Sequence, residues 1–368
     1  MSHFYSAKST RTSLMFMLLF IFICSLAVAR PNLVIVLVND QFRYDYLTRY
    51  ENQLTGGLKT ISTKGTFYTN AHLNYGTSHT GVGHATIGTG QSPDEHGIVA
   101  NYWYDRNAKK SVYCAEDSRY PVLARLQEAE AEGRKLTPAD LSSGRSPKKL
   151  QVTTLADSLR ISNNFHSRAY SLSFKDRSAI LMGGNLPNAS IWYDSKSGKF
   201  TSSTYYGKTL PDWVSSFNEK YPVDQYYGLK WTLLFDEKNY QLSHPERTAE
   251  ETGFGVPFPV TLTSASGKPD SQFYAQFAGT PYANDHLFEL AKFCIRYEKL
   301  GKSTTPDLLM VSFSPSDAIG HTYGPFGKAT QDAVMRYDMA LSDFLKFVDT
   351  EVGLNNTLIV YTADHGAP

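Results

Sequence analysis

The chain has 368 residues and a formal net charge of +1, with 36 basic and 35 acidic side chains. The nearly balanced charge and the absence of a Lys/Arg stripe exclude the electrostatic footprint of a nucleic-acid-binding protein. The length is sufficient for a large hydrophobic core and predicts two domains or one large α/β domain.

The first 29 residues have the pattern of a signal peptide. Lys8 and Arg11 precede an uncharged run over residues 13–29 that ends in AVA. A basic start, a short apolar run and a small-x-small end are what a signal peptidase recognises. A membrane anchor is the alternative, but a span requires about 20 apolar residues. We therefore predict an exported protein, periplasmic or extracellular, without a stable membrane span once residues 1–29 are removed.

Three segments share one design, a short continuous apolar and β-branched run that ends in aspartate. They are NLVIVLVND (32–40), DLLMVSFSPSD (307–317) and TLIVYTADH (357–365). Continuous apolarity is typical of a strand that is covered on both faces. Helical spacing over residues 329–352 makes the last two strands a parallel βαβ unit. Since sites in open parallel sheets form at the carboxyl ends of the strands, we expect the three aspartates there.

The middle of the chain is less regular. SRAYSLSF (167–174) predicts a fourth strand that leads into KDRSAILMGG, whereas residues 124–149 are predicted to be an exposed connection. Residues from about 185 to 282 have weak periodicity and many aromatic side chains. We interpret them as a packed insertion, with a cap that shapes the substrate pocket as the alternative.

Two cysteines follow the predicted signal peptide. Cys294 shares helical spacing with Leu287 and Leu290, which favours a core thiol. Export would also permit a disulfide with Cys114.

The strand-end residues form a set of oxygen and nitrogen ligands of the kind that zinc accepts. An aspartate at a strand end can also cap the next turn, and a lone histidine is usually structural. Three strand-end aspartates, two of them with a histidine within four residues, are harder to explain in that way, so we predict a metal site. Its members are Asp40, Asp317, His321, Asp364 and His365.

A loop rich in glycine and threonine covers residues 75–101, YGTSHTGVGHATIGTGQSPDEHGIVAN. Glycines let backbone amides approach an oxyanion, and a helix that begins there directs its positive end to the same place. A hydroxyl that binds a metal ion can lose its proton and become a nucleophile. A mobile loop is the alternative. By chemistry alone the candidate nucleophiles are Thr77, Ser78, Thr80, Thr86 and Thr89.

The order of the motifs along the chain resembles the alkaline phosphatase superfamily. The motifs are VNDQFRYDYL, HTGVGHATIGTG, HGIVANYWYD, SFKDR, SDAIGHTYGP and TADHGA. More narrowly, the chain is similar to the threonine-nucleophile alkaline phosphatases of the PafA type, relatives of the nucleotide pyrophosphatase/phosphodiesterases. The resemblance covers essentially all of residues 30–368. It implies an α/β fold, an alkaline-phosphatase-like three-layer sandwich around a mostly parallel sheet, with the aromatic-rich insertion at about 185–282.

The resemblance also implies roles for particular residues. Thr80 would be the nucleophile, and Asn101 would donate to a nonbridging phosphoryl oxygen. Lys175 and Arg177 would lie over the substrate phosphate, although without the resemblance a solvated charged turn is the simpler interpretation. Two Zn²⁺ ions would be held, one by Asp40, Thr80, Asp364 and His365, and the other by Asp317 and His321 with a further histidine.

These assignments predict a phosphomonoesterase, an alkaline phosphatase that hydrolyses small-molecule phosphate esters through a phosphothreonine intermediate. Lys175 and Arg177 favour a doubly charged monoester over a diester. A phosphodiesterase or nucleotide pyrophosphatase of the same superfamily is the first alternative. The further histidine has no counterpart before Pro368, so we interpret the sequence as a fragment. If the chain truly ended there, a catalytically dead metal-binding homologue would be the second alternative.

Overall fold

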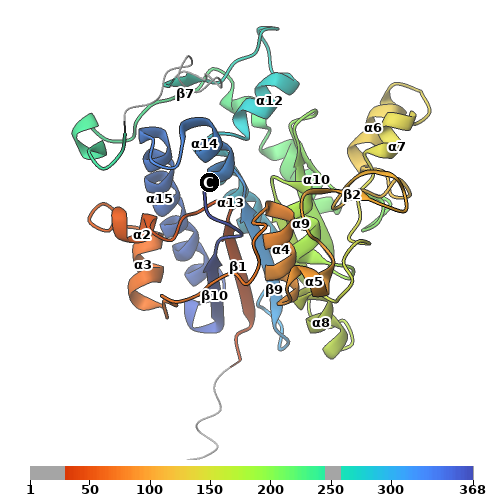
Figure 1. The fold of residues 1–368 in the computed structure, drawn as a ribbon, viewed down its shortest axis with the longest axis horizontal. Coiled ribbons are helices and arrows are strands. Elements are labelled where there is room, and N and C mark those ends of the chain that lie inside the picture. The colour runs from red at the N-terminus through yellow and green to blue at the C-terminus, as the bar shows by residue number, and fades with distance from the viewer. Residues whose placement is uncertain (1–29, 245–257, 368) are drawn as a thin grey trace, which may run out of the picture.

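The computed structural model describes residues 30–244 and 258–367 (Figure 1). The predicted signal peptide lies outside these residues. The main sheet has six strands: β1 (Leu33–Asn39), β4 (Ala169–Ser173), β5 (Ala189–Asp194), β6 (Lys199–Thr201), β9 (Asp307–Phe313) and β10 (Thr357–Thr362). Their order is β10-β1-β9-β4-β5-β6. All neighbours are parallel except β5 and β6, which confirms the predicted mostly parallel sheet.

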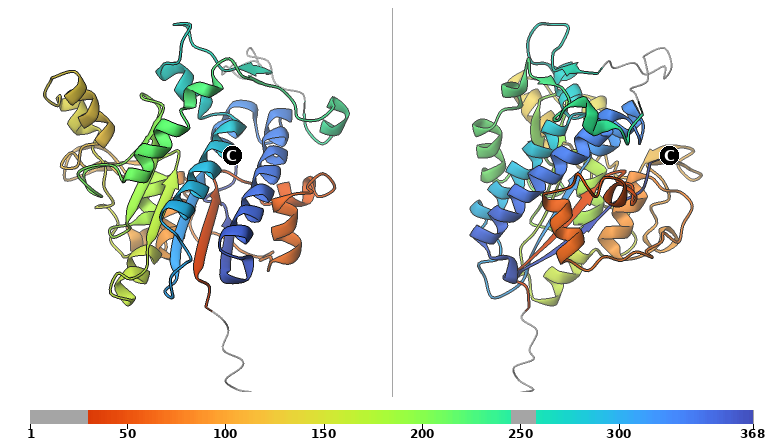
Figure 2. Two further views of the ribbon diagram at one scale, coloured as in Figure 1. Left: turned by 180° about the vertical axis from the view of Figure 1, so that it is seen from behind. Right: turned by 90° about the vertical axis from the view of Figure 1, so that its left-hand side faces the viewer.

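Helices cover both faces of this sheet (Figure 2). One layer contains α3 (Gly57–Lys64), α10 (Asp212–Lys220), α13 (Pro281–Tyr297) and α15 (Lys328–Glu351). The other contains α4 (Thr80–Thr89), α5 (Pro93–His96), α8 (Leu155–Ser162) and α9 (Asp176–Gly183). Strand β4 contacts α9 on one side and α13 on the other, so the sheet is the middle of three layers. Within the described ranges, no helix combines the length and apolar character that a membrane crossing needs.

Shorter elements make up the rest of the regular structure in the described residues. They are the helices α2 (Tyr46–Arg49), α6 (Leu123–Ala131), α7 (Pro138–Ser142), α12 (Ser271–Phe277) and α14 (Pro315–Tyr323), the hairpin β2 (Tyr102–Asp105) with β3 (Lys110–Tyr113), and the ribbon β7 (Lys230–Trp231) with β8 (Val260–Thr261). Short 3-10 helices lie at Val223–Tyr226, Glu237–Tyr240 and Leu354–Asn356.

The register of the central strands decides where the site forms. Val38 of β1 lies opposite Ser312 of β9 and Thr362 of β10. All three strands therefore end at the same level, and the residues that follow them meet at one edge of the sheet.

The predicted βαβ unit is confirmed. Strand β9, helix α15 and strand β10 follow in this order along the chain, and the two strands are parallel, with β1 between them in the sheet. Asp338 on α15 accepts hydrogen bonds from the backbone N–H groups of Gly56 at 2.6 Å and Leu58 at 2.7 Å. A carboxylate at a helix N-terminus satisfies free N–H groups and fixes α3 to α15. The helical spacing predicted over residues 329–352 corresponds to a core face of α15 that is buried at Val334, Tyr337, Leu341, Leu345 and Val348.

One expectation is wrong. Residues 124–149 are not an exposed connection, since they contain α7 and most of α6, and Ala129 is buried. Thr137 begins α7 with a capping box, a local signal that the polar composition of this stretch conceals. In the described residues, one face of β10 is open, since Leu358 and Val360 are 50% and 40% exposed.

Both described cysteines are buried, and neither Cys114 nor Cys294 has a disulfide partner. The prediction of a core thiol at Cys294 is confirmed by its complete burial on α13.

Within residues 185–282, β5, β6 and α10 belong to the central sheet and its helical layer, whereas α12 and the β7–β8 ribbon lie beyond the carboxyl ends of the strands (Figure 1). Asp332 of α15 anchors this outer part. Its carboxylate accepts hydrogen bonds from Trp231 Nε1 at 2.8 Å and Tyr240 Oη at 2.7 Å. The outer part is thus attached to the core, and its role as a cap stays a prediction.

His286 on α13 makes folding sensitive to acid. It is buried and stacked on Phe200, with ring centroids 5.6 Å apart, and burial lowers its pKa from 6.5 to about 4. The unfolded chain therefore binds this proton first, and stability falls by roughly 3 kcal/mol as the pH drops from 6.5 to 4. We expect His286→Phe to reduce the loss of unfolding free energy between pH 7 and pH 4.5, measured by urea denaturation. An unchanged loss in the variant would contradict this assignment.

Candidate functional site

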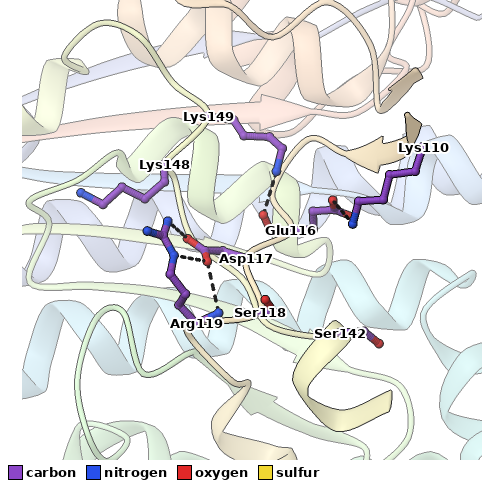
Figure 3. A pocket seen from close by; sticks show the side chains of 8 residues that line it. All are labelled: Lys110, Glu116, Asp117, Ser118, Arg119, Ser142, Lys148 and Lys149. Atoms are coloured by element: carbon purple, nitrogen blue, oxygen red, sulfur yellow. Dashed lines mark hydrogen bonds and ion pairs between the residues drawn. The ribbon is translucent and has the colours of Figure 1, made fainter. Parts of the chain in front are cut away.

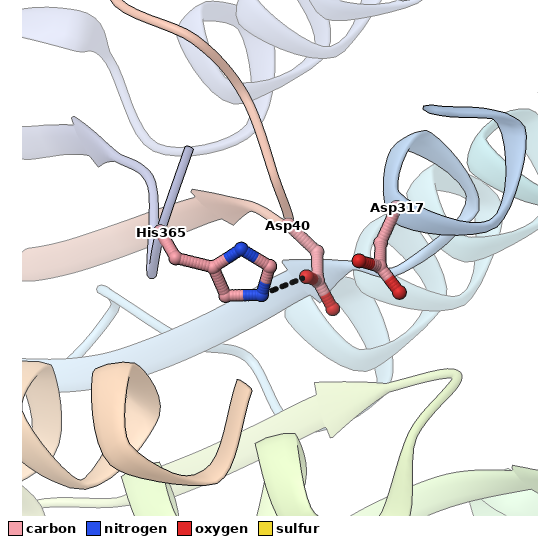
Figure 4. A group of neighbouring side chains, drawn as sticks. All are labelled: Asp40, Asp317 and His365. Carbon is pink, nitrogen blue, oxygen red and sulfur yellow. Dashed lines mark ion pairs between the residues drawn. The ribbon is translucent and has the colours of Figure 1, made fainter. Parts of the chain in front are cut away.

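Three predicted ligands meet at the carboxyl edge of the sheet (Figure 4). Asp40 follows β1, Asp317 lies in the first turn of α14 after β9, and His365 follows β10. One potential ligand atom from each lies within 4.8 Å of the others. Nε2 of His365 is 3.3 Å from Oδ1 of Asp40. The aligned strand ends thus bring together side chains that are far apart in the sequence.

The donor atoms fit a divalent cation. Oδ1 of Asp40 and Oδ2 of Asp364 are buried. Nε2 of His365 lies 3.3 Å from the first oxygen and 3.5 Å from the second, and Nδ1 of His84 lies 3.1 Å from the second. Two neighbouring buried carboxylates are unfavourable unless cationic groups compensate their charge. Two oxygens and an imidazole nitrogen that face one another are a ligand set that zinc accepts.

A second pair of predicted ligands lies beside the first set. Nε2 of His321 is 3.2 Å from Oδ1 of Asp317, one turn apart on α14. The spacing i, i+4 places both side chains on the same helix face. His321 is more exposed, with 60% of its side chain accessible.

The electrostatics of the site are dominated by burial and close charges. Burial alone would raise the pKa of Asp40, but the Lys175 ammonium and the two neighbouring histidines hold it well below its usual range. Burial and the Asp40 charge raise the pKa of Asp364. Burial would lower the pKa of His365, but Asp40 and Asp364 raise it to about 9. In the metal-free protein, His365 is therefore protonated at neutral pH.

Lys175 and Arg177 come from the start of α9 and point into the site. Nζ of Lys175 donates to Oδ2 of Asp40 and to Oδ2 of Asp317, each at 2.6 Å, and lies 3.4 Å from Oγ1 of Thr80. Nη2 of Arg177 lies 3.5 Å from the same hydroxyl. The two cations thus converge on Thr80 and do not form a solvated turn.

Thr80 is the first residue of α4 and is 3% exposed. The glycines after it allow close packing. The N–H of Gly81 donates to Oδ1 of Asn101 at 2.7 Å, which fixes the orientation of that amide. A Cβ at Gly83 would lie 2.2 Å from the carbonyl oxygen of Asp364, so only glycine lets α4 approach this ligand.

The other hydroxyl candidates lie elsewhere. Thr77 and Ser78 are exposed. The hydroxyl of Thr86 lies 3.1 Å from Nε2 of His96, and that of Thr89 donates to the carbonyl oxygen of Ala85. Among these five hydroxyls, the structure gives only Thr80 a contact with Lys175, Arg177 and His365.

Sequence reasoning missed His84, which supports the site from α4. Its Nδ1 lies 2.8 Å from the carbonyl oxygen of Thr80 and 3.1 Å from Oδ2 of Asp364. Its Nε2 lies 2.7 Å from Oγ of Ser312. Because a carbonyl oxygen only accepts, the proton is assigned to Nδ1, directed at both oxygens. The signal for His84 in the sequence was its spacing of four residues from Thr80.

Tyr113 and Asp176 were also missed. The hydroxyl of Tyr113 donates to Oδ1 of Asp176 at 2.5 Å, and Arg145 pairs with the other oxygen of this carboxylate. Nη1 of Arg177 lies 3.5 Å from the same hydroxyl. This chain of contacts supports the Arg177 guanidinium beside Thr80.

Gln41 is the third residue that was missed. It directly follows Asp40, is 3% exposed and has a φ of 63°. The left-handed region costs a residue other than glycine about 1–2 kcal/mol. A buried glutamine in this conformation is therefore expected to make contacts in the site that compensate this cost.

A separate surface cavity of about 350 Å³ lies beside the β2–β3 hairpin (Figure 3). It is rich in cations, but Arg119 pairs with Asp117 at 2.8 Å and Lys149 donates to the carbonyl oxygen of Glu116 at 2.8 Å. None of the predicted site residues lines it. We assign this cavity no function.

The chain is similar to known proteins over most of its length. The family model of type I phosphodiesterases / nucleotide pyrophosphatases matches residues 34–368. The chain belongs to this family. Among its relatives, the alkaline phosphatase PhoV of Synechococcus elongatus is 37% identical over 345 residues, and the alkaline phosphatase PafA of Elizabethkingia meningoseptica is 34% identical over 343 residues. These alignments cover 92% and 93% of the chain, but 60% and 61% of the relatives.

The crystal structure of wild-type alkaline phosphatase PafA matches with a TM-score of 0.80 at 33% identity, over 92% of this chain and 64% of that one. The predicted resemblance to the PafA-type alkaline phosphatases, relatives of the nucleotide pyrophosphatase/phosphodiesterases, and the predicted alkaline-phosphatase-like α/β fold are thereby confirmed. The chain spans about 60% of the length of the curated relatives it matches.

Proposed function

We propose that this protein is an exported, metal-dependent phosphatase that hydrolyses phosphate monoesters through a phosphothreonine intermediate on Thr80. The observation that carries the proposal is the position of the Thr80 hydroxyl. It lies at the N-terminus of α4, within 3.5 Å of Lys175, Arg177 and His365. The similarity to two proteins named alkaline phosphatases supports the same reaction class.

The residues that would hold zinc are those that the sequence predicts. Asp40, Asp364, His365 and Thr80 would hold one ion, and Asp317 and His321 would contribute to a second. Bound zinc would supply Lewis-acid activation of the attacking and leaving oxygens.

The protein side chains supply positioning and charge. Oγ1 of Thr80 gives up its proton and forms a bond to phosphorus while the bond from phosphorus to the ester oxygen breaks, and the departing alkoxide takes up a proton to leave as the alcohol. Water then attacks phosphorus and breaks the bond to Oγ1, which releases phosphate and restores the Thr80 hydroxyl. Lys175, Arg177 and the amide of Asn101 donate hydrogen bonds to the equatorial oxygens, where negative charge is concentrated. Because the buried Thr80 hydroxyl lies at the N-terminus of α4, the helix dipole also favours negative charge at this position.

A phosphodiesterase is the second candidate, and the family model favours it by name. Two cations beside Thr80 favour a dianionic monoester, because a diester has one charged oxygen fewer. One charge-assisted hydrogen bond is worth roughly 1.5–3 kcal/mol. We therefore expect kcat/KM for p-nitrophenyl phosphate to exceed that for bis(p-nitrophenyl) phosphate by about 10–100-fold.

The comparison has an internal control. Lys175→Ala and Arg177→Ala should each reduce turnover of the monoester more than that of the diester. The ratio of the two kcat/KM values should therefore fall in both variants. Faster turnover of the diester by the wild-type protein would overturn the monoesterase proposal and favour the phosphodiesterase.

A further inference from the structure

Gln41 occupies an unusual turn between two groups of predicted ligands. The turn over residues 39–42 is closed by a hydrogen bond from the N–H of Phe42 to the carbonyl oxygen of Asn39 at 3.2 Å. Gln41 is at its third position with a φ of 63°. Glycine or asparagine is usual at a turn position with positive φ. An unfavourable conformation that persists in a buried residue points to a function for its side chain.

The contacts of Gln41 reach both ligand groups. Its backbone N–H donates to Oδ1 of Asp364 at 3.1 Å. Its side-chain Nε2 donates to Oδ1 of Asp317 at 2.8 Å and lies 3.2 Å from Nε2 of His321. Nε2 of His321 thus lies between the amide of Gln41 and Oδ1 of Asp317, 3.2 Å from each. One residue thus sets the positions of ligands from β10 and from α14.

Helix α14 is shaped to receive this side chain. A Cβ on Gly320 would lie 2.0 Å from Oε1 of Gln41. Any other residue at position 320 would displace the amide or the helix. The glycine lies between Asp317 and His321 in the sequence, so the amide packs against the same turn that carries both ligands.

We propose that Gln41 is a positioning residue that holds Asp317 and His321 in the arrangement that binds a divalent cation. The inference rests on the proposed function only in taking these two residues as metal ligands. Hydrogen bonds from outside a coordination sphere orient the ligands, and losing one typically weakens metal binding by about 10–100-fold. The left-handed turn is what allows Gln41 to reach Asp364 with its backbone and Asp317 with its side chain.

The test measures zinc binding by the metal-stripped full-length protein, with Zn²⁺ titrated against a chromophoric chelator. Gln41→Met keeps the size of the side chain without the amide, and Gln41→Gly also relieves the left-handed turn. In both variants we expect one zinc equivalent to bind about 10–100-fold more weakly and the other to stay within about threefold. Lys299→Gly is the matched control, because Lys299 is exposed and has a φ of 51°.

Thermal unfolding of the metal-free proteins separates positioning from folding. Gln41→Gly should unfold at the wild-type temperature or above it while still losing zinc affinity. Unchanged zinc affinities in both variants would overturn the proposal, and tighter binding would also overturn it, since the amide would then compete with the ion. A wild-type protein that binds zinc but hydrolyses no phosphate ester would defeat the proposed function and leave the role of Gln41 standing.

Discussion

Replacing Thr80 with alanine is expected to lower kcat/KM for p-nitrophenyl phosphate by about 10⁴-fold or more, because loss of a nucleophile has effects of this order. The hydroxyl is the atom on which Lys175, Arg177 and His365 converge, and no other candidate hydroxyl of the loop reaches them. Alanine is a favourable helix residue, so α4 should still form. The measurement is steady-state kinetics together with the unfolding temperature of each protein.

Thr80→Ser is the control for this prediction. Serine keeps the hydroxyl, and we expect it to retain most of the activity, whereas alanine loses it at equal stability. Acid quenching during turnover should leave phosphate on the peptide that contains Thr80 in the wild-type protein, detected by mass spectrometry. An alanine variant that keeps more than about 1% of the activity would mean that water attacks the ester directly.

Removal of metal by a chelator is expected to lower the activity by about 10³-fold or more, since Lewis-acid stabilisation is worth several kcal/mol. Added Zn²⁺ should restore it. The two buried carboxylates of Asp40 and Asp364, which both face Nε2 of His365, are the structural reason. Full activity in a protein shown to contain no metal would contradict the metal-dependent proposal.

The metal-free protein should also show a defined pH dependence. Burial opposes protonation of His365, but Asp40 and Asp364 raise its pKa to about 9. Zinc must displace this proton, so its apparent affinity should increase about tenfold per pH unit from pH 7 to 9 and then level off. The raised pKa stabilises the metal-free fold fully below pH 6.5, and this contribution is lost as the pH rises through 9. Chelator competition and thermal unfolding over this range measure both effects.

The parts of the site that follow from chain order were predictable from the sequence. Asp40, Asp317 and Asp364 each follow an apolar strand, and parallel strands end together, so their proximity needs no detailed geometry. Thr80 was one of five equivalent hydroxyls by chemistry, and only the resemblance to a known family selected it. The structure adds a physical reason, because α4 begins at Thr80 and Lys175 reaches it.

The supporting residues were not predictable in the same way. Gln41 acts through a positive φ and through partners 276 and 323 residues away in the chain. His84 contacts Ser312, which is 228 residues away. No local pattern encodes such pairings, because they depend on the sheet register and on how closely glycines let α4 and α14 approach.

Strand β10 is the edge strand of the sheet in the described residues, and this has a consequence for refolding the polypeptide. Its sequence, TLIVYT, has no charge, no proline and no glycine, and in the described residues only β1 pairs with it. Six-residue segments of this composition on an unpaired edge can add strands from other molecules and seed cross-β assembly. Refolding of residues 30–368 should therefore yield less native protein as the concentration rises, and dilution or a charged substitution at Leu358 should recover it.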